Sequence, residues 1–150
     1  MFTKVDKILV PVNGHSAGEA AFRLACELSQ NNKSKLFALY VIEVEQELPV
    51  DAELADKTAL GETVLERIEM VSHEMKRPVE ADIVQARHAG PAIVQEAVDK
   101  QVGLLVLGIP FKSHLGAFAL GQATSYILEN TPCPVILWRE PVAAAPATMA

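Results

Sequence analysis

The sequence contains few cysteines, and they are not paired. Its 150 residues include two, Cys26 and Cys133, which lie far apart and outside any C-x-x-C pair. This excludes a disulfide framework and the usual ligand spacing of a structural zinc site. We therefore expect no structural metal and two small, buried, apolar cysteine side chains.

Long apolar runs and an excess of basic residues are also missing. No stretch approaches the ~18 consecutive apolar residues of a membrane span, and MFTKVDKILV lacks the cleavage site of a secretory signal. The formal net charge of -6 argues against the basic surface that nucleic-acid binders present to phosphates. We expect a cytoplasmic protein with neither a membrane nor a nucleic acid as partner.

The sequence instead alternates two kinds of apolar pattern. Short continuous or alternating runs predict strands at residues 7–12, 35–44, 79–86, 103–108 and 133–138. Apolar residues at helical spacing predict helices at residues 16–32, 58–77, 90–101 and 122–130. This alternation predicts an α/β domain doubly wound around a parallel sheet. We expect one domain over residues 1–140 and a disordered Ala/Pro tail over 141–150.

Ligands of doubly wound folds bind at the carboxyl ends of the strands, where the strand order reverses. Three segments follow strands that should meet there: residues 13–16, the chain from Val41 onward, and residues 108–124. We therefore expect any small-molecule site to be built from these segments.

The stretch VNGHSAG, residues 12–18, matches the G-x-S-x-G motif of serine hydrolases, with Ser16 as nucleophile. That interpretation is the least favoured, because Ser16 follows the first strand and leaves no room upstream for an oxyanion-hole motif. A serine here more simply predicts a helix N-cap. The S-x-x-E spacing to Glu19 further indicates a capping box.

The segment before the last helix has the composition of a phosphate-binding loop. Gly108, Gly116 and Gly121 give the backbone freedom to approach a ligand, Lys112 and His114 add cationic or donor character, and a helix N-terminus follows. The alternative is that the glycines only close tight turns and the two polar side chains are solvated. The loop is not a Walker A motif, because Gly-Lys-Ser/Thr is absent.

Together with the glycine-containing loop, three stretches carry a family resemblance: KILVPVNG, GLLVLG and the ending SYILENTPCPVILW. Through these stretches, the chain resembles the universal stress protein family over residues 5–140. The resemblance implies a Rossmann-like five-stranded sheet with strand order 3-2-1-4-5 and helices on both faces. Nucleotide-binding members carry G-x2-G-x9-G-[S/T] after strand 4. Here that pattern falls on Gly108, Phe111, Gly121 and Gln122, so the second and fourth positions depart from it.

The resemblance also implies a set of nucleotide-binding residues. The family's Asp after strand 1 is Asn13 here, which keeps the size but loses the charge that would hold ribose hydroxyls. Val41 matches the position whose backbone meets adenine. The implied ligand is an adenine nucleotide, ATP or AMP, with Mg²⁺ accompanying ATP. The implied contacts are Pro11, Val12, Asn13, Gly14, Val41, Gly108, Pro110, Phe111, Lys112, His114, Gly116, Gly121, Gln122, Ala123 and Thr124.

A homodimer is the expected assembly. The last strand is apolar on both faces and lies at the sheet edge, and in the resembled family it pairs with its copy. Val135, Leu137 and Trp138 are then expected near the seam. The alternative is that the acidic segment 45–57 or the C-terminal tail covers that edge.

Two functions of different classes follow from the sequence. The first is a stress-response module whose bound nucleotide orders loop 108–121 and changes a surface read by an unknown protein partner. The second is a dimeric interaction protein that needs no ligand. Another anionic ligand, including a cyclic dinucleotide, stays open. No catalytic constellation is apparent, so we expect no enzyme, and hydrolysis of bound ATP cannot be deduced from these residues.

Overall fold

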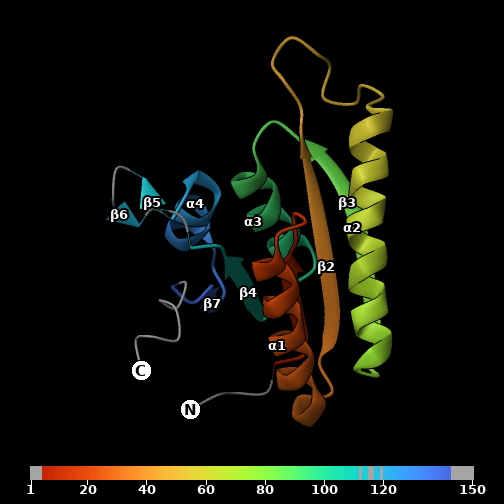
Figure 1. Cartoon of the computed structure of the whole chain (residues 1–150), viewed down its shortest axis with the longest axis vertical. Coiled ribbons are helices and arrows are strands. Elements are labelled where there is room, and N and C mark those ends of the chain that lie inside the picture. The colour runs from red at the N-terminus through yellow and green to blue at the C-terminus, as the bar shows by residue number, and fades with distance from the viewer. Residues whose placement is uncertain (1–4, 112, 115–116, 119, 143–150) are drawn as a thin grey trace, which may run out of the picture.

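Five parallel strands form the centre of the computed structural model, which describes residues 5–111, 113–114, 117–118 and 120–142 (Figure 1). Their order is β3-β2-β1-β4-β7, which confirms the predicted order 3-2-1-4-5. The strands are β1 (Lys7–Pro11), β2 (Lys35–Glu43), β3 (Val79–Ala86), β4 (Leu104–Ile109) and β7 (Val135–Arg139). Residues 143–150 of the predicted tail lie outside the described part.

Two helices cover each face of the sheet, which confirms the doubly wound arrangement. On one face, α1 (Ser16–Asn32) and α2 (Ala55–Glu74) bury residues such as Phe22 and Ile68 against Val10 of β1. On the other, α3 (Ala89–Asp99) and α4 (Gln122–Asn130) bury Ile93 and Ile127 against Leu9 and Leu105. Because β1 and β4 are central and apolar on both sides, each contributes alternate residues to the two cores.

The element boundaries differ from the prediction in small ways. Helix α2 begins at Ala55 and ends at Glu74, and Lys76 beyond it adopts a left-handed φ of 57°. Helix α3 ends at Asp99, before Gln101 at a φ of 55°. The last strand begins at Val135, two residues later than predicted.

A short antiparallel pair lies where the sequence predicted only a loop. Strands β5 (Ser113–His114) and β6 (Ala117–Phe118) have two residues each (Figure 1). Strands this short show no alternation of apolar and polar residues, so the sequence carried no signal for them.

The predicted capping box at the start of α1 is wrong. Ser16 is the first helical residue rather than the N-cap, and His15 before it makes no side-chain cap. The Ser16 hydroxyl instead donates to Glu140 Oε2 at 3.3 Å, while Glu19 accepts from Arg67 Nε at 2.7 Å. Both side chains are therefore engaged with charged partners from distant elements and not with the local backbone. Among the described side chains, the hydrogen-bond partner of Ser16 is thus a carboxylate and not the histidine that a serine nucleophile requires.

Candidate functional site

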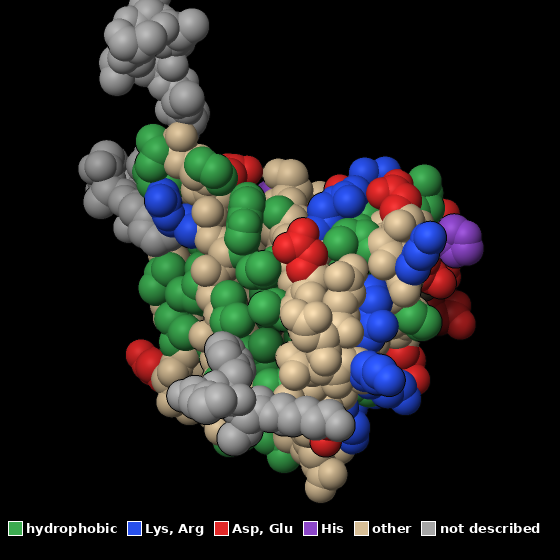
Figure 2. Space-filling model, turned by 90° about the horizontal axis from the view of Figure 1, so that it is seen from below, with side chains coloured by type: hydrophobic (Ala, Val, Ile, Leu, Met, Phe, Trp, Pro, Cys, Tyr) green, Lys and Arg blue, Asp and Glu red, His purple; other side chains and the backbone are tan. Residues whose placement is uncertain are grey.

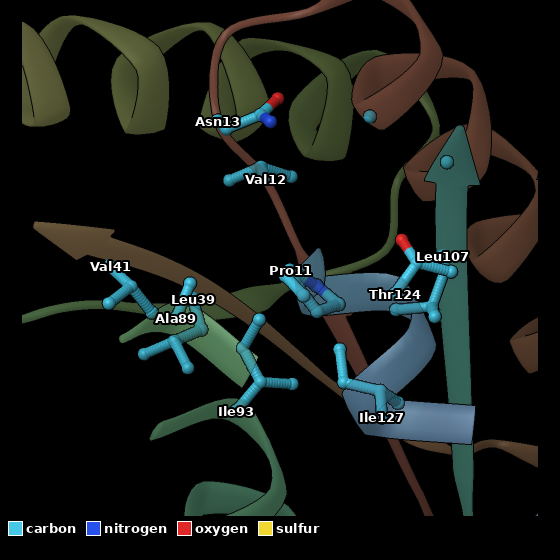
Figure 3. A pocket seen from close by; sticks show the side chains of 13 residues that line it. Pro11, Val12, Asn13, Leu39, Val41, Ala89, Ile93, Leu107, Thr124 and Ile127 are labelled. Atoms are coloured by element: carbon cyan, nitrogen blue, oxygen red, sulfur yellow. The ribbon is translucent and has the colours of Figure 1, made fainter. Parts of the chain in front are cut away.

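A cleft opens at the carboxyl ends of β1, β2 and β4, where the chain leaves neighbouring strands toward opposite faces of the sheet (Figure 3). Its cavity measures about 120 Å³. The three segments expected to meet each contribute to the lining, and further lining residues come from within β1, β2 and β4 and from α1, α3 and α4. It consists of Pro11, Val12, Asn13, Gly18, Leu39, Val41, Ala89, Ile93, Leu107, Gly108, Ala123, Thr124 and Ile127.

The walls of this cleft are mainly apolar. In Figure 3, one group of side chains from β2 and α3 faces another from β4 and α4, and Pro11 lies between them. The first group is Leu39, Val41, Ala89 and Ile93, and the second is Leu107, Thr124 and Ile127. A slot with apolar walls and few polar groups is the usual environment of a bound ring system.

The polar groups of the described lining gather at two places on the rim. At the end of β1, Asn13 Oδ1 accepts the backbone N–H of His15 at 3.2 Å, and Gly14 adopts a φ of +96° that favours glycine. This turn fixes the Asn13 amide beside the slot. Across the cleft, Thr124 lies in the first turn of α4, whose N-terminal N–H groups favour an anion.

Gly108 is required by backbone packing at the cleft. A Cβ at this position would collide with the Ala17 carbonyl group and stand 2.8 Å from Gly18 N. The absence of a side chain therefore lets β4 lie directly against the first turn of α1. Because Gly18 and Gly108 both line the cleft, this contact also shapes one of its walls.

The segment after β4 is held by the residues that end β7. Phe111 N–H donates to Glu140 Oε1 at 3.3 Å, and Glu140 N–H donates to the Ile109 carbonyl oxygen at 2.7 Å. The Arg139 guanidinium lies 5.2 Å from the centre of the Phe111 ring, a cation–π distance. Glu140 does not stand out in the sequence, because none of its neighbours marks it as a partner of residues far away in the chain.

Seven of the fifteen predicted contact residues line the cleft. They are Pro11, Val12, Asn13, Val41, Gly108, Ala123 and Thr124. Six further lining residues were not predicted, because their apolar or small side chains look like ordinary core or helix residues in the sequence. These are Gly18, Leu39, Ala89, Ile93, Leu107 and Ile127.

The other predicted residues lie elsewhere or outside the described part. Gly14 lines a neighbouring cleft between α1 and α2, and Gln122 lines another beside Tyr126. Pro110, Phe111 and Gly121 are described but are not among the residues lining the slot. Lys112, Gly116 and the side chain of His114 lie outside the described part.

The neighbouring cleft between α1 and α2 contains a strong ion pair. Arg67 donates to both carboxylate oxygens of Glu19, at 2.7 Å from Nε and 3.1 Å from Nη2. Arg23 adds a second cation at 3.4 Å. These hydrogen bonds, that from Arg67 above all, lower the pKa of Glu19 below its usual value. The Arg67 guanidinium is therefore already paired with a carboxylate at this cleft.

Neither a cluster of metal ligands nor a membrane-spanning helix occurs in the described ranges. In these, no group of three or more His, Cys, Asp or Glu side chains is close enough to hold a metal ion. No helix in the same ranges is long and apolar enough to cross a bilayer.

A family model for the universal stress protein family matches residues 4–139. The chain belongs to this family. A relative named universal stress protein MJ0531, from Methanocaldococcus jannaschii, is 23% identical over 141 residues, which cover 90% of this chain and 82% of the relative.

Solved structures of the family share the fold. A universal stress protein from Archaeoglobus fulgidus superposes with a TM-score of 0.75 at 16% identity, covering 88% of this chain and 97% of that one. A structure described as the universal stress protein of the same organism in complex with dAMP gives a TM-score of 0.71 at 12% identity, covering 90% and 98%. At sequence identities this low, the comparison with these two structures shows that the fold is shared and nothing more.

Proposed function

We propose that this protein binds an adenine nucleotide in the cleft at the carboxyl ends of β1, β2 and β4, as a regulatory module of the stress response. The observation that carries the proposal is the apolar slot with its polar rim, located where the strand order reverses. A relative of the same fold whose structure is described as a complex with dAMP supports this ligand class.

The proposed pose follows from the chemistry of the lining. The adenine ring lies between Val41 and Ile127, because a flat heteroaromatic ring gains most from two apolar walls. Asn13 meets the ribose hydroxyls. The phosphate side faces the N-terminus of α4, where Thr124 supplies a hydroxyl and the helix dipole favours negative charge. From the sequence, Lys112 and His114 stay proposed phosphate contacts.

The proposed activity is binding without catalysis. The Ser16 hydroxyl is bonded to the Glu140 carboxylate, and the described residues hold no cluster of metal ligands. Where ATP is the ligand, Mg²⁺ is carried by its phosphates. A nucleotide bound in the cleft then alters the surface around the segment after β4, and a partner protein recognises the altered surface.

A homodimer through β7 is part of the proposal. This strand lies at the sheet edge and is paired on one side with β4. Leu137 is 40% exposed, whereas Val135 and Trp138 are half-buried against the two cores. Figure 2 shows apolar side chains on the side of β7 and α4 and charged ones on the side of α2. The exposed apolar residues on these two elements include Leu128 and Leu137.

The segment predicted as an alternative cover for that edge lies at the other side of the sheet. Gln85 Nε2, on β3, donates to the carbonyl oxygens of Val50 at 2.9 Å and Ala52 at 3.0 Å. Because β3 and β7 are opposite edges, residues 45–57 do not protect β7.

A ligand panel in a thermal-shift experiment tests nucleotide binding. With AMP, ATP, adenosine and a cyclic dinucleotide at about a hundred times Kd, a true ligand raises the melting temperature by about 5–10 °C. Ala123→Trp fills the slot and should abolish the shift, whereas Glu129→Trp, an exposed position on the same helix, should keep it. No shift with any compound would favour the ligand-independent interaction protein instead.

A further inference from the structure

Glu140 holds together two elements that are distant in the chain. Its carboxylate accepts the Ser16 hydroxyl at 3.3 Å through Oε2 and the Phe111 N–H at 3.3 Å through Oε1. Its own N–H is bonded to Ile109, so its backbone is fixed as well. The side chain therefore lies between the start of α1 and the segment after β4.

This position is one that attracts negative charge. Ser16 is the first residue of α1, where unpaired N–H groups and the helix dipole favour an anion. Phe111 contributes a backbone N–H of the kind that holds phosphate oxygens in loops. The Glu140 carboxylate thus uses donors that a phosphate group would use.

The segments that hold Glu140 continue into the lining of the cleft. Ser16 itself lines the neighbouring cleft, but Glu140 N–H is bonded to the carbonyl oxygen of Ile109, which directly follows Gly108. Gly18, two residues beyond Ser16, and Gly108, three residues before Phe111, both line the cleft. A nucleotide whose base fills the slot has its phosphates at the mouth, beside these segments. An additional phosphate charge on this side of the cleft would meet the negative charge of Glu140, and like charges repel each other.

We propose that Glu140 determines the charge of the ligand: it restricts the site to adenosine compounds with at most one phosphate and disfavours the triphosphate. This inference rests on the proposed adenine-nucleotide function and specifies its ligand class. The residue acts by occupying donors and by its charge, and it does not have to touch the adenine ring.

The decisive comparison is between the natural chain and Glu140→Gln, with Kd measured by calorimetry for adenosine, AMP and ATP in EDTA. Glutamine keeps the shape and one acceptor oxygen but removes the charge. We expect the variant to bind ATP about tenfold more tightly and adenosine within about twofold of the natural chain. Glu69→Gln, an exposed residue near the far end of α2, is the control with the same charge change and should alter none of the three.

Two further measurements separate charge from loosened structure. The gain in ATP affinity of Glu140→Gln should shrink as salt is raised, because screening weakens repulsion in the natural chain. Glu140→Asp keeps the charge and should still disfavour ATP, so a gain in ATP affinity for this variant as large as that for Glu140→Gln would assign the effect to loosened structure and overturn the role of charge. An equal gain for all three ligands, or no gain for ATP, would overturn the role of Glu140 while leaving nucleotide binding intact. If neither the natural chain nor any variant binds adenosine, AMP or ATP, the proposed function itself would be overturned.

Discussion

Gly108 lies directly against the backbone of Ala17, so close that even a methyl group at position 108 would overlap the Ala17 carbonyl. The contact joins the central strand β4 to the first turn of α1, and the neighbouring Gly18 forms the wall of the cleft at this point. A glycine that sequence reasoning assigns to phosphate approach is thus explained by packing alone.

Gly108→Ala should destabilise the fold by at least about 2 kcal/mol, because neither backbone can move without shifting a whole element. Urea unfolding measures the loss. Gly18→Ala is the matched control, since its Cβ would lie 3.6 Å from Val12 in ordinary contact and alanine favours a helix. Equal stability of the two variants would contradict the packing explanation.

Asn13→Asp should strengthen adenosine binding by about threefold to tenfold, because a carboxylate is a stronger acceptor for ribose hydroxyls than an amide. The aspartate also keeps the acceptor for His15 N–H, so the turn is preserved. Calorimetry with adenosine and with 2′,3′-dideoxyadenosine tests this. A gain of the same size for the dideoxy compound would show that the residue does not meet the ribose.

Glu19→Gln should lower stability near neutral pH by about 0.5–1 kcal/mol, and this difference should diminish in acid. Arg67 holds the pKa of Glu19 below its usual 4.5 in the folded state. The stabilisation is therefore fully present above that value and is lost as pH falls through the folded pKa. Urea unfolding of both proteins near pH 7 and near pH 3 measures it. A difference that is the same size at both pH values would assign the effect to packing.

Cys26 should resist thiol reagents in the folded protein, because burial raises its pKa to about 11 and leaves little thiolate at pH 8. Cys133 is only half-buried, which corrects the expectation that both cysteines are buried. We expect native Cys133→Ser to be nearly inert to DTNB and to react fully once unfolded. Rapid labelling of the native variant would show that α1 opens readily.

Leu137→Lys should convert a dimer to a monomer, because it places a charge at the centre of the exposed edge strand. Light scattering after size exclusion measures the mass. Leu60→Lys, at an exposed position of α2, should leave the dimer intact. A monomeric natural protein, or a dimer that both variants keep, would remove β7 as the interface.

The sheet and its helices were predictable because their signal is local. Runs such as GLLVLG and the helical spacing around Ile68 carry the pattern of buried elements within a few residues. Ser16 was predicted wrongly for the opposite reason: its partner Glu140 is separated from it by 124 positions. Local reasoning assigns such a residue to the nearest available role, here the helix cap.

The polar rim of the cleft was more predictable than its walls. Asn13 and Thr124 stand out as polar residues next to strand and helix ends, whereas Leu39 and Ile93 have the same apolar character as the core around them. Only the three-dimensional arrangement separates an apolar residue that faces a ligand from one that faces another side chain.

The cleft draws its walls from both ends of the chain, from Pro11 on the first strand to Ile127 on the last helix. During synthesis, the residues of β1 and β2 are made before those of β4 and α4, which form the opposite wall. Strand β1 becomes a central strand only once β4 has paired with it. The cleft is therefore complete only after α4 has been made. A chain that terminates before α4 lacks the wall formed by Ala123, Thr124 and Ile127, so the proposed binding site cannot form in such a fragment.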